Sequence, residues 1–405
     1  MVKKSSAIIA CVVVCVFSLA IAGILTFSAY QYYLVSNHRL KTADEQRLDE
    51  IRQIYHNYAL DDVPDGELYD GAAKGMAWGS GDVYSSFFTA EEYGEFQEAD
   101  AGKYVGIGVS VNVDPVDGLI TAVNIYRHSP AEAGGMQPGD KIVKVDDTDV
   151  AGLTLEQTVK LVRGEAGSPV RITVLRDDDM VELTLVRAEV KVDYAEGGMK
   201  ENGIGYIKIQ EFSGDLNLDN NAATMFDNLV QDLKEKGMKG LILDLRNNPG
   251  GGLDIVSPIA DELFPAGPII TMEDRDGREL PNGRIMSDEA HLGIPMVVLI
   301  NENSASASEL LCGGIQDYKV GTLIGVTTYG KGVGQQFATL SDGSVLKYTA
   351  FKYLTGGGRC PQEVGIQPDI TVELPESVKK NPLKLCTPED TQYMRALQEI
   401  EKMIR

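Results

Sequence analysis

The sequence predicts a multidomain α/β and β protein with an N-terminal transmembrane helix, a helical N-terminal region, a β-rich domain, a layered α/β core and a C-terminal helix. Three observations predict this class. An uncharged apolar run lies near the N-terminus, short β-branched runs separated by turn residues follow, and longer apolar runs then alternate with helical periodicity. The length of 405 residues fits about two to three domains.

Composition and charge exclude several classes of protein. The chain is 43% hydrophobic and 24% charged, which is typical of globular proteins and excludes wholesale disorder. Its net charge of −23 repels the phosphate backbone, so we expect no nucleic-acid partner. Five cysteines without a C-x-x-C pair or a His-rich tract offer neither a disulfide scaffold nor a zinc site, so we expect no structural metal.

Residues 1–30 are predicted to form a short cytoplasmic region and a transmembrane anchor. The apolar run from Ala7 to Ala29 would reach about 34 Å as a helix, slightly more than a hydrocarbon core of about 30 Å. The small-x-small sequence at 20–22 leaves a cleaved signal peptide open. The short basic N-terminus favours an inside orientation. We therefore expect a single-pass protein of the cell membrane with its functional part extracytoplasmic, or a secreted protein if the segment is cleaved.

Residues 31–102 are predicted to be a helical N-terminal region. Four side chains recur at helical spacing between residues 43 and 60: Leu48, Ile51, Tyr55 and Tyr58. This stripe predicts an amphipathic helix that either packs or dimerises. An exposed spacer next to the membrane is the alternative.

Residues 103–188 are predicted to be a compact β-rich domain. Short β-branched runs alternate with turn residues, and one helix is expected at 154–163, where Leu155, Val159 and Val162 share a face. Residues 189–376 instead read as a layered α/β core. Apolar strands at 204–209, 241–245, 295–300 and 323–326 accompany a helix at 222–236, and continuous apolar strands of this kind are buried on both faces.

Residues 377–405 are predicted to end in an amphipathic helix. Thr387 has the character of an N-cap, with Pro388 at the first helical position and acidic residues in the first turn. An apolar stripe follows, made of Tyr393, Leu397, Ile400 and Ile404. The N-terminal and C-terminal helices could together form a homodimer interface.

Three segments rich in glycine or serine follow apolar strands of the α/β core, where open sheets usually place their sites. The first, at 246–252, predicts either an oxyanion hole or a plain turn. The second contains Ser306, which could be a nucleophile aided by the helix N-terminus and the Ala307 N–H, or could merely cap the helix in an S-x-x-E box with Glu309. The third surrounds Lys331 and alone is typical of a surface turn.

The choice of base favours a catalytic reading of Lys331. None of the four histidines, at positions 38, 56, 128 and 291, is an obvious partner for Ser306. A lysine can replace histidine as general base if burial lowers its pKa from about 10.4 to about 7 to 8. Competing serine signatures fail, because G-x-S-x-G is absent and the S-x-x-K at 377–380 lacks its partner motifs.

Taken together, NENSASASELL, GKGVGQQ and LILDLRNNPGG resemble the C-terminal processing peptidase family, also called tail-specific proteases. The resemblance extends from GDVYSSFFTAEEYGEF to VGIQPDI and implies a serine endopeptidase with a peptidase core at 189–376 and no cofactor. It implies that Ser306 is the nucleophile, Lys331 the general base and Gln335 the residue that orients the lysine. The N–H groups of Ala307 and of Gly251, or alternatively Gly250, would form the oxyanion hole.

The β-rich domain at 103–188 resembles the PDZ domain embedded in that family. Four residues, Gly106, Ile107, Gly108 and Val109, would belong to its carboxylate loop, whose N–H groups hold the terminal carboxylate of a substrate. The implied partners are proteins with unstructured C-termini, selected by an apolar pocket lined by Ile107 and the helix at 155–162. For this domain alone, the alternative is a rigid spacer without a ligand. For the whole protein, the alternative is a catalytically silent PDZ scaffold that regulates another membrane protease.

Three cysteines lie beyond the anchor. Cys360 and Cys386 could pair, although their Cα separation is not evident from sequence. Cys312 lies within an apolar helix and is predicted to be a buried free thiol.

Overall fold

The computed structural model describes residues 42–100, 104–113, 117–153, 155–176, 179–190, 192–288, 291–379 and 384–405. The predicted anchor at 1–30 lies outside the described residues. Within these ranges, no helix combines the length and the apolar character that are needed to cross a membrane. The chain divides into two compact units, 1–75 and 76–405.

The described part of the first unit consists of α2 (Ala43–Tyr58) and the start of α3 (Asp65–Gly79). Thr42 caps α2, because its hydroxyl accepts the N–H of Glu45 at 3.2 Å and the Glu45 carboxylate accepts the N–H of Thr42 at 2.6 Å. The helix predicted between residues 43 and 60 is thus confirmed. Its residues are not buried, so whether its stripe packs against another chain stays a prediction.

A six-stranded sheet forms the centre of the second unit. Its strand order is β10 (Ala195–Met199), β11 (Ile204–Ile209), β12 (Gly240–Asp244), β15 (Met296–Ile300), β16 (Thr322–Gly325) and β19 (Ile370–Thr371). All neighbours pair in parallel except β10 and β11, which are antiparallel. The four apolar runs expected as strands of the α/β core are confirmed as β11, β12, β15 and β16.

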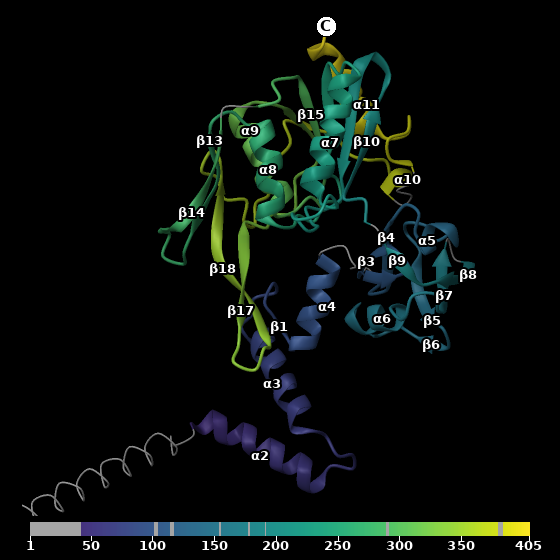
Figure 1. Ribbon diagram of the computed structural model, residues 1–405, viewed down its shortest axis with the longest axis vertical. Helices are drawn as coiled ribbons and strands as arrows, with labels where there is room; N and C mark the ends of the chain where they lie inside the picture. Colours follow the sequence, from purple (N-terminus) through teal and green to yellow (C-terminus); the bar gives the residue numbers. More distant parts are fainter. Residues whose placement is uncertain are drawn as a thin grey trace, which may run out of the picture. The chain divides into compact units, whose positions relative to one another are not determined.

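Helices cover both faces of this sheet (Figure 1). On one face α7 (Ala222–Glu235), α8 (Leu253–Leu263) and α9 (Ala307–Tyr318) share a core with Ile207, Leu243 and Val298. On the other face α11 (Thr391–Met403) packs with Ile242 and Leu299. Alternate residues of each strand therefore enter different cores, as expected for strands buried on both faces.

The C-terminal helix differs from its prediction in two respects. It begins at Thr391 and its N-cap is Asp390, whose carboxylate accepts the N–H of Tyr393 at 3.0 Å; Thr387 lies in a preceding turn. Its apolar face is buried against the sheet, with Tyr393 7% and Ile400 0% exposed. The chain itself therefore covers this face, and whether the C-terminal helix takes part in a homodimer stays a prediction.

A second, antiparallel sheet lies beside α8 and α9. It contains β1 (Ser86–Phe88), β18 (Val345–Thr355), β13 (Gly267–Glu273) and β14 (Glu279–Ser287), and β17 (Val333–Thr339) pairs with β18. Ser86 pairs with Lys347 and Gln335 pairs with Thr349. The long strand β18 therefore places the segment around residue 86 close to the segment that follows Lys331.

The β-rich domain contains a sheet of β3 (Val109–Val113), β4 (Ile120–Ile125), β5 (Lys141–Val145), β7 (Pro169–Arg176) and β8 (Asp179–Val186), with β6 (Thr148–Asp149) beside β5. A separate pair joins β2 (Tyr104–Gly106) to β9 (Ala188–Val190), and the two helices are α5 (Pro130–Ala133) and α6 (Leu155–Val162). Helix α6 confirms the helix predicted at 154–163. The remaining elements are α4 (Ala90–Asp100), η1 (Glu201–Gly203) and α10 (Glu376–Lys379).

A buried ion network ties the start of α11 to the end of β12. The guanidinium of Arg246, 1% exposed, lies 2.6 Å from the Asp244 carboxylate and 2.8 Å from that of Asp390. Burial alone would raise the pKa of Asp244, but Arg246 outweighs burial and holds that pKa below its ordinary value. The pairing therefore keeps the buried Asp244 carboxylate ionised inside the protein.

We expect Arg246→Ala to lower the free energy of unfolding at pH 7 by about 3–5 kcal/mol, because it leaves two buried carboxylates without their cation. Urea denaturation measures this change. The control is Arg278→Ala, since Arg278 pairs with Asp276 at the surface and is 74% exposed; this variant should change stability by about 0.5 kcal/mol or less. Equal losses in the two variants would show that the network is not stabilising.

Candidate active site

Three serines lie where β15 leads into α9, and the structure distinguishes among them: Ser304 and Ser306 belong to the connecting loop and Ser308 to the first turn of α9. The hydroxyl of Ser304 donates to the carbonyl of Leu245 at 2.8 Å, and that of Ser308 donates to the carbonyl of Asn248 at 2.9 Å. Both residues are completely buried, whereas Ser306 is partly exposed. The outer serines thus attach this region to the segment after β12, and of the three serines Ser306 alone is partly exposed.

The backbone at Ser306 has φ 55° and ψ −114°, a conformation that costs a residue with a side chain on the order of 1–3 kcal/mol and is common at functional sites. A Cβ at Gly250 would lie 2.8 Å from the Ser306 Cβ, so a glycine is required there for the two loops to approach. The Ser306 N–H donates to the Glu309 carboxylate at 2.8 Å. This bond, from the Ser306 N–H to the Glu309 side chain, is one of the two hydrogen bonds of the predicted capping box. Both a capping and a nucleophilic role for Ser306 fit the geometry.

Glu309 joins the loop of Ser306 to the loop of Lys331. Its carboxylate is fully buried and accepts hydrogen bonds from the hydroxyl of Thr328 at 2.6 Å, the N–H of Gly330 at 2.7 Å and the N–H of Lys331 at 2.8 Å, besides that of Ser306. One buried carboxylate therefore joins the two loops through four hydrogen bonds. The sequence indicated Glu309 only as a capping residue, because its contacts with residues 328–331 are long-range.

Tyr353 makes a second link between the same two loops. Its hydroxyl lies 2.7 Å from the carbonyl oxygen of Ser306 and 2.7 Å from that of Lys331. Burial raises the pKa of Tyr353 well above its ordinary value, so the hydroxyl keeps its proton and remains a donor. Tyr353 lies within β18, and no local sequence signal indicated a role for it at the site.

The side chain of Lys331 is half-buried and held on two sides. Its Nζ donates to Oε1 of Gln335 at 3.0 Å and lies 4.4 Å from the centroid of the Tyr84 ring. Burial lowers the pKa of Lys331 and the nearby Lys347 lowers it further, while Asp82 and Glu309 act in the opposite direction. The net lowering increases the neutral fraction of the amine, which is what a general base requires.

The loop after β12 contains three consecutive glycines, whose N–H groups differ in whether they have an acceptor. The N–H of Gly250 donates to the side chain of Asn248 at 2.9 Å, and that of Gly252 donates to the carbonyl of Phe212 at 2.8 Å. Within the described ranges, the N–H of Gly251 has no acceptor among these contacts. Ala307 is the first residue of α9, where an N–H has no partner within the helix. The geometry therefore favours Gly251 over Gly250 as a donor to a ligand.

Comparisons with known proteins show the family to which the chain belongs. The model of peptidase family S41 matches residues 203–372, and a PDZ-domain model matches residues 121–176. The chain is 31% identical over 366 residues to the carboxy-terminal processing protease CtpA of Bacillus subtilis (strain 168), covering 89% of this chain and 76% of that protein. The chain belongs to peptidase family S41. The expected serine-type peptidase of the carboxy-terminal processing family is thereby confirmed.

Two further proteins are similar to this chain over most of its length. The carboxy-terminal-processing protease of Bartonella bacilliformis is 33% identical over 354 residues, which cover 84% of this chain and 78% of that protein. The solved structure of the photosystem II D1 C-terminal processing protease is 27% identical, with a TM-score of 0.59, and the match covers 84% of this chain and 91% of that one.

In the PDZ domain of this S41 peptidase, the predicted carboxylate loop joins β2 to β3. Gly108 has φ 77°, and a Cβ there would lie 2.3 Å from the Ser129 Cβ, so the turn requires glycine. The side chain of Ile107 is 2% exposed and lies in the domain core together with residues of α6. The apolar side chain of Ile107 is packed inward, and whether Ile107 and α6 line a pocket for a substrate stays a prediction.

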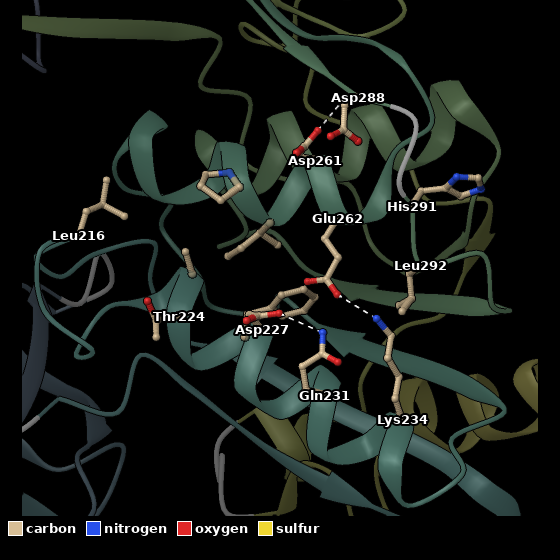
Figure 2. Close-up of a pocket in the computed structure, with 14 residues that line it drawn as sticks. Leu216, Thr224, Asp227, Gln231, Lys234, Asp261, Glu262, Asp288, His291 and Leu292 are labelled. Carbon is tan, nitrogen blue, oxygen red and sulfur yellow. Dashed lines mark hydrogen bonds and ion pairs between the residues drawn. The ribbon is translucent and has the colours of Figure 1, made fainter.

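A separate cavity of about 640 Å³ lies between α7 and α8 (Figure 2). Lys234 pairs with Glu262 across it at 3.4 Å, and Gln231 donates to Asp227 at 3.3 Å. Its lining includes His291 but neither Ser306 nor Lys331. The cavity is thus distinct from the peptidase site, and the sequence analysis did not indicate it.

The three described cysteines are free thiols. Cys312 is buried, as predicted. The suggested bond between Cys360 and Cys386 is not formed. The thiol of Cys386 lies 3.0 Å from the Tyr206 hydroxyl, and the sulfur of Cys360 lies 3.8 Å from the carbonyl of Gly332.

Proposed function

We propose that this S41 peptidase is a membrane-anchored serine endopeptidase that recognises protein C-termini through its PDZ domain and cleaves peptide bonds near them with a Ser306–Lys331 dyad. The observation that carries the proposal is the buried Glu309 carboxylate, which binds the main-chain N–H groups of both Ser306 and Lys331 at 2.8 Å. A nucleophile and a base need fixed mutual positions, and one acceptor holds both.

In the proposed reaction, the neutral amine of Lys331 takes the proton of the Ser306 hydroxyl as Oγ bonds to the carbonyl carbon of the scissile peptide. The N–H groups of Gly251 and Ala307 stabilise the negative charge that develops on the carbonyl oxygen, with help from the N-terminus of α9. The Lys331 ammonium then returns the proton to the leaving amine as the C–N bond breaks. Water, deprotonated by Lys331, then attacks the acyl carbon, and the Lys331 ammonium returns this proton to the Ser306 Oγ as the acyl–oxygen bond breaks. Gln335 orients the lysine throughout.

The experiment for the overall function compares the C-termini of extracytoplasmic proteins in cells that carry wild type or Ser306→Ala. We expect shortened C-termini in wild type and full-length ones in the variant. Identical C-termini in the two strains, with the same cellular effect, would instead favour the catalytically silent PDZ scaffold.

The proposal of a membrane anchor rests on the uncharged run between Ala7 and Ala29. Alkaline extraction of membranes should leave the full-length chain in the pellet and release a chain that begins at residue 42. Recovery of a mature protein without residues 1–30 from the medium would favour a secreted enzyme.

A free substrate C-terminus should increase kcat/KM if the PDZ domain recognises it. Charge-assisted hydrogen bonds contribute about 1.5–3 kcal/mol, so amidation of an otherwise identical peptide should lower kcat/KM roughly tenfold to a hundredfold. The matched control is a variant lacking 103–188 joined by a short linker, in which the preference for the free acid should disappear. Equal kcat/KM values for acid and amide with wild type would contradict recognition of C-termini.

A further inference from the structure

The segment that precedes β1 contributes directly to the surroundings of Lys331. The ring of Tyr84 is half-buried and its centroid lies 4.4 Å from the lysine Nζ. This distance is typical of a cation–π contact. Tyr84 also interacts with Tyr329, which lies two residues before the lysine, and this interaction adds to the effect of burial in raising the pKa of Tyr84. An aromatic side chain more than 200 positions away in the sequence thus covers the amine.

Asp82 fixes the position of this segment. Its carboxylate accepts the N–H of Tyr84 at 3.0 Å, the hydroxyl of Ser85 at 2.5 Å and the N–H of Thr349 at 3.3 Å. The Thr349 hydroxyl in turn accepts the side-chain N–H of Gln335 at 3.2 Å. One residue of β18 therefore holds both the segment that carries Tyr84 and the glutamine that binds the lysine.

We propose that Tyr84 is a positioning residue for Lys331. The Tyr84 ring covers the lysine amine, limits the conformations of the lysine side chain and keeps bulk water away from the amine. This inference rests on the proposed role of Lys331 as general base. Gln335 binds the amine through one hydrogen bond, and one bond leaves the rest of a flexible four-carbon stem unrestrained. The ring face supplies the second restraint.

Other charged and titratable groups near Lys331 come from each neighbouring element. Asp82 precedes β1, Glu309 belongs to α9, Lys347 to β18 and Tyr329 to the loop before the lysine. The Tyr84 ring has two opposite effects on the pKa of Lys331. Its π face stabilises the ammonium, while its bulk excludes the water that would solvate the ammonium. Burial has the largest effect on the pKa of Lys331. Opening the site to water should therefore raise that pKa.

The test measures kcat/KM against pH for the full chain with Tyr84→Phe and Tyr84→Ala, normalised to the concentration of sites that react with a fluorophosphonate. Tyr84→Phe keeps the ring and should stay within about twofold of wild type, with an unchanged midpoint. In Tyr84→Ala, kcat/KM at pH 7 should fall about tenfold or more. The midpoint of its pH profile should move to higher pH, and kcat/KM should partly recover at that higher pH. Tyr348→Ala removes an exposed tyrosine of β18 as the control and should leave the midpoint unchanged.

A wild-type or lower midpoint in Tyr84→Ala would overturn the inference, because a merely structural residue changes the number of active molecules and not the titration of their base. A Tyr84→Phe variant that behaves like Tyr84→Ala would also overturn it by assigning the effect to the hydroxyl. Failure of the dyad is separately visible. In that case Lys331→Arg keeps its turnover, whereas an inactive Lys331→Arg with an unshifted Tyr84→Ala rejects only the role of Tyr84.

Discussion

Replacing Ser306 by alanine should abolish peptide cleavage while leaving the protein folded. Loss of a helix cap costs only about 1 kcal/mol, and the Glu309 contacts to the main chain do not require the hydroxyl. Loss of the nucleophile removes the acyl-enzyme route altogether. On the same preparation, steady-state hydrolysis of an unstructured peptide should therefore be abolished, while a thermal melt should show a folded protein.

The neighbouring serines provide matched controls for this experiment. Ser304→Ala and Ser308→Ala each remove a buried hydroxyl that donates to a main-chain carbonyl, so each should lower the free energy of unfolding by about 1–3 kcal/mol. Both should retain cleavage under conditions in which they are folded. Cleavage by Ser306→Ala would show that Ser306 is not the nucleophile. Selective loss of cleavage in a stable Ser304→Ala or Ser308→Ala would instead assign the nucleophile to that serine.

Replacing Lys331 by arginine should nearly abolish activity although it preserves the positive charge. A guanidinium, whose pKa exceeds about 12, does not accept a proton at neutral pH. In wild type, activity should rise with pH as Lys331 loses its proton, and the lowered pKa of this residue places that rise below the ordinary lysine value of about 10.4. Rates of peptide hydrolysis between about pH 6 and pH 10 measure both effects.

Lys352→Arg is the matched control, since Lys352 is an exposed residue of β18. It should show wild-type rates and the same pH profile. Near-normal turnover by Lys331→Arg would exclude lysine as the base, and a wild-type rate that does not vary with pH over this range would do the same.

The α/β core was predictable because its strands are buried on both faces. Runs such as that around Leu243 or Val298 are continuously apolar, and that pattern is hard to produce by chance. The segments around Ser306 and Lys331 were also evident, since glycine and small residues interrupt the apolar runs there. Local sequence therefore indicated where the site residues lie.

What joins those segments was not predictable from local patterns. Tyr84 and Tyr353 belong to or precede strands of an antiparallel sheet whose faces are partly exposed, and such strands carry a weak periodic signal. Their contacts with Lys331 depend on strand pairing across the chain. Likewise, Thr387 has a good local signal for an N-cap, but Asp390 both caps α11 and pairs with buried Arg246, and a tertiary ion pair of this kind leaves no local trace.

The central claim, that Lys331 activates Ser306, is tested most directly by fluorophosphonate labelling followed by mass spectrometry of the peptide that contains residues 303–309. An unactivated serine does not react at an appreciable rate, so the label reports activation independently of any substrate. The account predicts a single phosphonate adduct on Ser306 in wild type and a labelling rate at least about a hundredfold lower in Lys331→Arg at neutral pH. An adduct on another serine, or a wild-type labelling rate in Lys331→Arg, would contradict it.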